Sequence, residues 1–358
     1  MTAPRKAGQD GAAGQAAAAE RADAASVMTG QEALDGLVAL LDLERLEANL
    51  FRGFSPPHSP TRVFGGQVAG QALVAAGRTV EPDRAVHSLH SYFVRPGDPR
   101  VPIVFDVERI RDGRSFTTRR VRAVQRGEVI FTLAASFQLP QPGVEHAEPA
   151  PTGVPAPEEL PDLGERLRGE RTFLTGVPRP LDLRFVEAPL WSSRRGPATD
   201  EPQRVWMRAD GTLPDDPMLH VCLLTYASDL TLLASVLAPH PLHMGEVGLA
   251  SLDHAMWFHR PFRADEWLLY ECRSPSASGA RGLATGRFFT RDGRMIASLD
   301  HAMWFHRPLD ADEWLLYHQK SPAAQGARGL AEGFIYSQDG VLRVTVMQEG
   351  LIRPVKPA

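Results

Sequence analysis

The sequence is poor in cysteine and in net charge, and both shortages narrow the possible functions. Cys222 and Cys272 are its only cysteines, so neither a disulfide framework nor a cysteine-based metal site is expected. The formal net charge of −4 over 358 residues gives no electrostatic basis for binding nucleic acid or an anionic membrane. The histidines, among them His87, His254 and His259, show no convincing metal-ligand spacing, so we favour structural roles and predict no metal site.

The chain also lacks the segments that direct proteins to membranes or organelles. No apolar run approaches the roughly 18 residues needed to span a bilayer. The N-terminus is rich in Ala and Gly but has no apolar signal-peptide core, and the C-terminal VKPA is neither a peroxisomal nor an ER signal. We therefore expect a cytoplasmic protein. The absence of a GxSxG motif excludes the nucleophile elbow of the serine hydrolases.

The most informative feature present is a tandem repeat near the C-terminus. The segment SLDHAMWFHRP occurs at 251–261 and again at 298–308. Alignment of 251–297 (copy one) with 298–344 (copy two) gives 30 identical and 17 different pairs, too many differences for a simple assembly duplication. A weaker echo, HSLHSYFVRP, lies about 165 residues upstream at 87–96. The older, longer duplication predicts two similar structural units.

Each unit combines apolar helices with runs typical of antiparallel strands. Residues 64–79 are nearly all apolar and predict a buried helix, and Pro217–Leu237 predicts a second long apolar helix. Leucine spacing between Gly30 and Phe51 predicts a shorter amphipathic helix. After Asp83, β-rich runs alternate with glycine-containing turns. We therefore expect an α+β fold of two helix-plus-sheet units that form a pseudo-dimer.

Composition suggests where these units begin and end. A stretch rich in Pro and acidic residues separates the two halves and is typical of a linker. The expected divisions are a disordered tail at 1–30, an N-terminal unit at 31–138, the linker at 139–163, and a C-terminal unit at 164–358 that contains both copies of the repeat.

Several motifs, in this order, resemble the acyl-CoA thioesterase II family. They are VFGGQVAGQAL, HSYFVRPGD, TYASDL, SLDHAMWFHRPF and VMQEGLIRP, and the resemblance extends over about residues 34–355. It implies a double hotdog fold and the hydrolysis of fatty acyl-CoA to free fatty acid and CoA, with no metal or organic cofactor. By analogy with other hotdog proteins it also implies a homo-oligomer.

The resemblance assigns three residues to a catalytic water. Asp229 in TYASDL matches the family's aspartate, Ser251 in LASLDH its threonine or serine, and Gln348 in VMQEG its glutamine. Thioester hydrolysis needs an aimed water, an acceptor for its proton, and donors for the developing oxyanion. The resemblance therefore predicts that Asp229, Ser251 and Gln348 together hold the attacking water.

The residues themselves support these assignments only in part. Asp229 is a carboxylate in an apolar run, where burial is costly unless the charge is useful, and burial would raise its pKa as suits a general base. It could instead lie on an exposed stripe or cap a helix break after Ser228. Ser251 alone is unremarkable. Gln348 alternates with Val344 and Val346, which places it on the core-side face of a strand.

Other residues are weaker candidates for contacts with the substrate. The turn at Gly66 and Gln67 opens a helix, so its N–H groups could face the thioester oxygen or simply allow close packing. Arg260 and Arg281 could bind the CoA phosphates or be charges at hairpin edges. An Asp253–His254 dyad of the hydratase type is excluded, because adjacent strand residues point to opposite faces.

The tandem repeat puts the site in doubt, because only one copy can occupy the second unit. One arrangement keeps Ser251 beside Asp229, excludes about 252–298, and still ends at Gln348. The alternative places Ser298 in the site, and in copy one His301 takes the position of the glutamine. The surplus segment must loop out, extend a sheet edge or pair with another chain. The alternative function is therefore an inactive protein that only binds acyl-CoA.

Overall fold

The computed structural model describes residues 27–57, 59, 61–170, 176–242, 244, 246–299, 303–308 and 312–352. The predicted tail at 1–30 and the predicted site residue His301 therefore lie largely or wholly outside the described residues. The N-terminal half contains α2 (Gly30–Leu41), β1 (Glu44–Glu47), β2 (Leu50–Gly53), α3 (Gly65–Gly77), β3 (Ala85–Phe93), β4 (Ile103–Asp112), β5 (Phe116–Gln125) and β6 (Glu128–Gln138).

The C-terminal half repeats this order of elements. The connection carries β7 (His146–Ala147), η1 (Pro157–Glu159) and α4 (Leu163–Arg166). It is followed by β8 (Leu181–Phe185), β9 (Gln203–Ala209), α5 (Pro217–Ser228), η2 (Leu233–Leu237), β10 (Asp253–Phe258), β11 (Leu268–Ser278), β12 (Arg281–Thr290) and β13 (Met295–Leu299). Copy two and the residues that follow it form β14 (Met303–Phe305), β15 (Leu316–Gln325), β16 (Arg328–Tyr336) and β17 (Leu342–Leu351).

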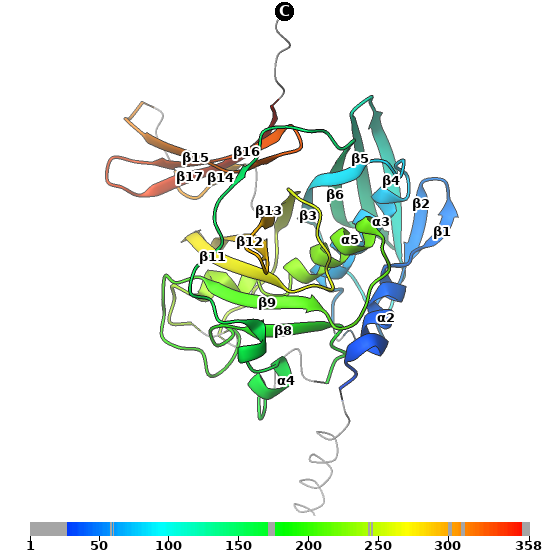
Figure 1. Cartoon of the computed structure of the whole chain (residues 1–358), viewed down its shortest axis with the longest axis horizontal. Coiled ribbons are helices and arrows are strands. Elements are labelled where there is room, and N and C mark those ends of the chain that lie inside the picture. Colours follow the sequence, from blue (N-terminus) through cyan, green and yellow to red (C-terminus); the bar gives the residue numbers. More distant parts are fainter. Residues whose placement is uncertain are drawn as a thin grey trace, which may run out of the picture.

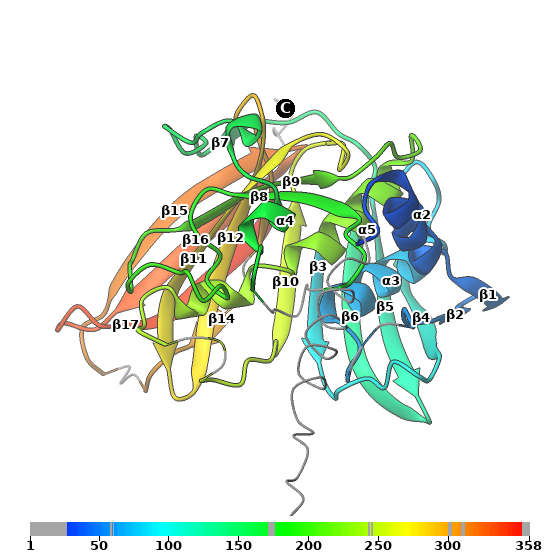
Figure 2. The same cartoon turned by 90° about the horizontal axis from the view of Figure 1, so that it is seen from below.

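The two halves share one antiparallel sheet of 12 strands, in the order β1-β2-β4-β5-β6-β3-β10-β13-β12-β11-β9-β8 (Figures 1 and 2). The sequence β3-β6-β5-β4 on one side of the centre mirrors β10-β13-β12-β11 on the other. The older duplication is therefore visible as two equivalent meanders, and the α+β expectation is confirmed. The central seam joins β3 to β10, with Leu89 opposite Met256 and Ser91 opposite His254.

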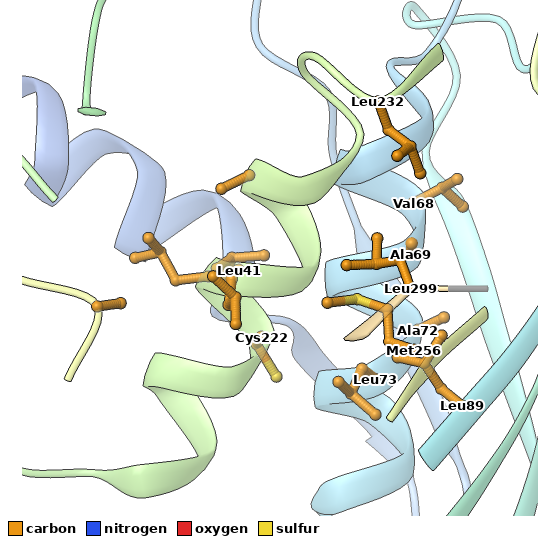
Figure 3. Packing of buried hydrophobic residues seen from close by; sticks show 14 of the residues in the cluster. Leu41, Val68, Ala69, Ala72, Leu73, Leu89, Cys222, Leu232, Met256 and Leu299 are labelled. Atoms are coloured by element: carbon orange, nitrogen blue, oxygen red, sulfur yellow. The ribbon is translucent and has the colours of Figure 1, made fainter. Parts of the chain in front are cut away.

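Helices α3 and α5 pack against each other on one face of this sheet (Figures 1 and 3). Helix α5 begins at Pro217 because the side chain of Asp216 caps it by accepting a hydrogen bond from the N–H of Met218 at 2.9 Å. The helices touch through glycine: a Cβ on Gly66 would lie 2.3 Å from the backbone oxygen of Tyr226. Any side chain at Gly66 would push the two helices apart.

The predicted helix over Pro217–Leu237 is divided in the structure. Helix α5 ends at Ser228, and η2 follows after a turn. By length and composition this stretch could span a membrane, so the expectation that no run reaches that length was wrong. Most of the stretch is buried inside the protein, however, as is usual for a core helix. Figure 3 shows Cys222 and Leu232 from this stretch packed near Val68 and Leu73 of α3.

Copy two forms a separate sheet. Its order is β14-β17-β16-β15, and β7 from the connection pairs with β15 at the edge. This order is the same as β10-β13-β12-β11, so copy two reproduces the meander of copy one. Neither arrangement expected for the surplus segment is found: copy one is complete in the main sheet, and copy two stacks beside it as a second layer (Figure 1).

The second sheet is attached through small apolar clusters and ion pairs. Ala323 packs with Leu269 and Phe289, while Leu330 and Met347 pack with Ala255 and Trp257 of β10. Charges also cross between the layers. His87 of β3 pairs with Glu349 of β17 at 2.7 Å, and Arg287 of β12 pairs with Glu148 beside β7 at 2.7 Å and lies 3.7 Å from Glu332 of β16. The contact is thus specific but rich in charge.

The repeat also shows what the second sheet lacks. In copy one, Tyr270 is fully buried, and its hydroxyl donates to the backbone oxygen of Ser228 at the end of α5. The equivalent Tyr317 in copy two is 47% exposed. Figure 1 shows β14–β17 lying away from α3 and α5. Tyr317 is therefore exposed where its counterpart is buried, because no helix in the described part of the chain covers this face of the second sheet.

Candidate active site

Asp229 is the C-cap of α5, at the point where this helix meets the N-terminus of α3. The helix ends there because Ser228 is fully buried and turns its hydroxyl back to the backbone oxygen of Thr225 at 2.9 Å. The interpretation of Asp229 as a residue at a helix break is therefore confirmed. The same position also makes it half-buried and places it on the wall of a pocket.

Two neutral donors hold the Asp229 carboxylate. The hydroxyl of Ser251 donates to Oδ1 at 3.3 Å, and the backbone N–H of Gly66 donates a second hydrogen bond. Burial raises the pKa of Asp229 to about 6, although these two bonds and the charge of Arg62 lower it. Asp229 can therefore exchange a proton near neutral pH, which suits a general base.

Gly65 makes this placement possible. A Cβ on Gly65 would lie 2.5 Å from Oδ2 of Asp229 and 2.9 Å from the ring of Phe93. These distances are shorter than van der Waals contact, so only glycine leaves room for the carboxylate. The N-terminus of α3, with its partial positive charge, can then face Asp229. The FGGQ segment is thus required for the position of the carboxylate.

A pocket of about 810 Å³ extends from Asp229 and Ser251. Its walls come from the turn and η2 after α5, the start of β10, the β11–β12 hairpin, and Tyr92 of β3. Apolar side chains line most of it, among them Leu232, Val236 and Leu283. The pocket therefore combines one carboxylate–hydroxyl pair with room for an apolar ligand.

The two candidate arginines lie in different places. Arg281 is exposed on the wall of the pocket. Burial lowers the pKa of the nearby His306, and the charges of Arg307 and Arg281 lower it further. Arg260 instead donates to the backbone oxygens of Met295 at 2.9 Å and His146 at 3.4 Å. Arg260 therefore has a structural role at the strand ends, as its alternative interpretation held.

Gln348 does not join the site. It lies on β17 of the second sheet, opposite Ala331, and its side chain is exposed. The expectation that it occupies the core-side face was wrong: its neighbours Met347 and Glu349 contact Trp257 and His87 of the main sheet, so Gln348 faces away from that sheet. Gln348 is not among the residues that line the pocket.

Ser298 is also remote from the carboxylate. It lies on β13 opposite Trp257, where its hydroxyl is hydrogen-bonded to Nε2 of His259 at 2.9 Å. The structure therefore places Ser251 of copy one beside Asp229 and leaves Ser298 in the strand. His301 lies outside the described residues.

One of the two backbone donors predicted on α3 is already bonded. The N–H of Gly66 donates to Asp229 and so positions the carboxylate. The side-chain amide of Gln67 is buried and donates to the backbone oxygen of Phe54 at 3.0 Å and to the hydroxyl of Ser55 at 3.1 Å, so this side chain holds the preceding loop. The role of the Gln67 backbone N–H as an oxyanion donor stays a prediction.

The histidines have structural partners, as favoured from the sequence. Nε2 of His254 is 2.9 Å from the hydroxyl of Ser228, and burial lowers the pKa of His254 to about 4, so the ring is neutral. His87 is bonded to Ser136 at 2.8 Å and paired with Glu349. Within the described parts of the chain, no group of three or more His, Cys, Asp or Glu is placed to hold a metal ion.

Sequence reasoning missed the contribution of copy two to this pocket. Trp304, Phe305 and His306 line it together with residues of copy one. The identity of WFH at 304–306 with 257–259 shows that these residues form a strand end, but nothing in the sequence shows where that strand lies. Their position depends on how the second sheet stacks on the first.

Comparison with known proteins agrees with this fold. The model of the acyl-CoA thioesterase N-terminal domain matches residues 54–138. The acyl-CoA thioesterase model matches 181–298 and, separately, 295–351, so it recognises the second half and then copy two. A conserved protein with a hot dog fold from Alicyclobacillus acidocaldarius has a TM-score of 0.61 at 20% identity, covering 74% of this chain and 95% of its own, which bears on the fold alone.

Two relatives are considerably more similar in sequence. Acyl-coenzyme A thioesterase 8 of Rattus norvegicus is 44% identical over 275 residues, which cover 72% of this chain and 84% of the relative. The crystal structure of an acyl-CoA thioesterase II from Mycobacterium marinum is 49% identical with a TM-score of 0.62. The match covers 74% of this chain and 95% of the Mycobacterium marinum structure. About a quarter of this chain therefore has no counterpart in that structure.

Two equivalent helix-and-sheet units around one carboxylate pocket, together with these matches, define a double hotdog protein of the thioesterase class. More specifically, the chain belongs to the acyl-CoA thioesterase II family, whose members are thioester hydrolases.

Proposed function

We propose that the protein hydrolyses fatty acyl-CoA to free fatty acid and CoA, with Asp229 as general base. The observation that carries this proposal is the half-buried carboxylate, hydrogen-bonded to Ser251 and facing an apolar pocket, with a pKa raised to about 6. A base with this pKa is mostly ionised at neutral pH yet remains able to accept a proton.

The proposed reaction uses one water and leaves the carboxylate unchanged. Asp229 takes a proton from the water as its oxygen attacks the thioester carbonyl carbon. The C–S bond then breaks, and the departing thiolate of CoA receives the proton from Asp229. The hydroxyl of Ser251 donates a hydrogen bond to Asp229, and its oxygen can accept one from the water and so fix the water's direction of attack.

The pocket supports the substrate class. Leu232, Val236 and Leu283 offer apolar surface to an acyl chain.

One observation favours a second function, an acyl-CoA-binding protein without turnover. Gln348, which the family resemblance assigns to the water, is exposed in the second sheet. Copy two separates Gln348 from copy one in the sequence, and in copy one His301 takes the position of this glutamine.

The test is the release of free thiol from palmitoyl-CoA by the full-length protein and by Asp229→Asn. Removal of a general base typically lowers the rate by about 100- to 10,000-fold. We expect turnover by the wild type and a loss of this size in the variant, with substrate still bound. Equal rates in both proteins would reject Asp229 as the base, and binding without release by the wild type would favour the second function.

A further inference from the structure

We propose that copy two is part of the substrate site, with Phe305 forming an apolar wall for the distal part of a long acyl chain. The inference rests on the proposed acyl-CoA substrate and deepens it, because it names a specificity-determining residue supplied by the repeat. Phe305 and Trp304 line the same pocket as Asp229 and Ser251.

The backbone around Phe305 is fixed in the way that copy one is fixed. Phe305 lies opposite Val344, as Phe258 lies opposite Ala297 in copy one. Nε2 of the following His306 is 2.9 Å from the hydroxyl of Thr345. The wall is therefore a strand end with a defined register rather than a loose loop.

Arg307 joins this strand end to the pocket. Its guanidinium donates to the backbone oxygen of Leu342 at 3.0 Å, within the second sheet, and to that of Ala277 at 3.4 Å, in the β11–β12 hairpin. Ala277 itself lines the pocket, and so does Arg281 on the other side of the hairpin turn. Arg307 thus connects the two sheets where Phe305 faces the cavity, and it acts as a positioning residue.

The exposure of Phe305 indicates what it does. Its counterpart Phe258 is 4% exposed in the core, whereas Phe305 is 60% exposed. An exposed aromatic ring that lines an apolar pocket gains free energy when a ligand covers it. Short acyl chains held near Asp229 would not extend far from the carboxylate, so the gain should depend on chain length.

Binding of non-hydrolysable S-alkyl-CoA thioethers separates this inference from catalysis. Calorimetric titrations would compare S-hexadecyl-CoA with S-butyl-CoA on the full-length wild type, on Phe305→Ala and on Phe305→Leu. We expect Phe305→Ala to weaken S-hexadecyl-CoA about 10-fold, the scale for losing part of a buried aromatic contact. The affinity of Phe305→Ala for S-butyl-CoA should change less than about twofold. Phe305→Leu should bind S-hexadecyl-CoA more tightly than Phe305→Ala but less tightly than the wild type.

Trp314→Ala is the matched control. Trp314 belongs to the same repeat and is 85% exposed, but it lines a separate hollow with Leu316 and Tyr336. This variant should bind both thioethers as the wild type does. Equal effects of Phe305→Ala on the two thioethers, or no binding of either by the wild type, would overturn the inference. Chain-length-dependent binding by a wild type that releases no thiol would instead leave the wall intact and reject the hydrolytic function.

Discussion

Replacement of Asp229 by Asn should make the protein more stable at alkaline pH while removing its activity. Burial raises the pKa of Asp229 from 3.8 to about 6, so folding favours the protonated carboxyl. The sign follows from linkage: the native state binds more protons than the unfolded chain between these two values, so the carboxylate destabilises the fold increasingly as pH rises from 4 to 6. Above pH 6 the cost is constant.

The size of the effect can be worked from the same shift. About two pKa units at roughly 1.4 kcal/mol per unit give a cost of about 3 kcal/mol for the ionised carboxylate at pH 8. Asparagine is neutral and avoids this cost, but it can accept only one of the two hydrogen bonds from Ser251 and Gly66 well, a loss of about 1 kcal/mol. The net gain for Asp229→Asn is then about 2 kcal/mol at pH 8, and about zero near pH 4.5, where the wild-type cost has fallen to about 1 kcal/mol.

Thermal unfolding of both proteins across this pH range measures the effect. A difference of 2 kcal/mol corresponds to an increase in Tm of about 3 °C for a protein of this size. Asp215→Asn is the control, since the side chain of Asp215 is 96% exposed and its replacement should matter little at any pH. A Tm difference between Asp229→Asn and the wild type that is the same at pH 4.5 and pH 8 would refute a burial-raised pKa at this site.

Three further changes test the placement of the site. Gly65→Ala should lower kcat about 10-fold or more in thiol-release assays, because its Cβ would lie 2.5 Å from the Asp229 carboxylate. Gly36→Ala is the control and should leave kcat unchanged, since the space around Gly36 is open. Equal rates in the two variants would contradict the close approach of Gly65 to Asp229. Gln348→Ala should leave the rate of the full-length protein unchanged, and a large loss would show that Gln348 reaches the water. Deletion of 298–344 gives Gln348 the sequence position that His301 holds in copy one. In that background Gln348→Ala should lower the rate, and an unchanged rate would contradict the assignment of this glutamine to the water.

The helix-plus-sheet organisation could be predicted because local signals agreed with the fold. The apolar run at 64–79 becomes α3, and the repeated SLDHAMWFHRP and HSLHSYFVRP segments become the paired central strands β10 and β3. The pairing of Asp229 with Ser251 also followed from motif order. Such features depend on hydrophobic periodicity and on the order of elements, and both can be read from short segments of the sequence.

The place of copy two could not be predicted in the same way. Both copies carry the same strand signals. No short segment of the sequence distinguishes copy one, which packs against α5, from copy two, which does not. Tyr270 and Tyr317 are equivalent in sequence, yet one is buried under a helix and the other is half-exposed. The choice depends on long-range packing, and so do the exposure of Gln348 and the arrival of Phe305 at the pocket.

The pH dependence of kcat/KM for palmitoyl-CoA, measured on the full-length protein, tests most directly whether copy one forms a working site with Asp229 as base. Because the pKa of Asp229 is raised to about 6, we expect kcat/KM to be constant above pH 7 and to fall below pH 6, about 10-fold by pH 5. A profile that stays flat down to pH 5, or no release of thiol at any pH, would contradict this mechanism.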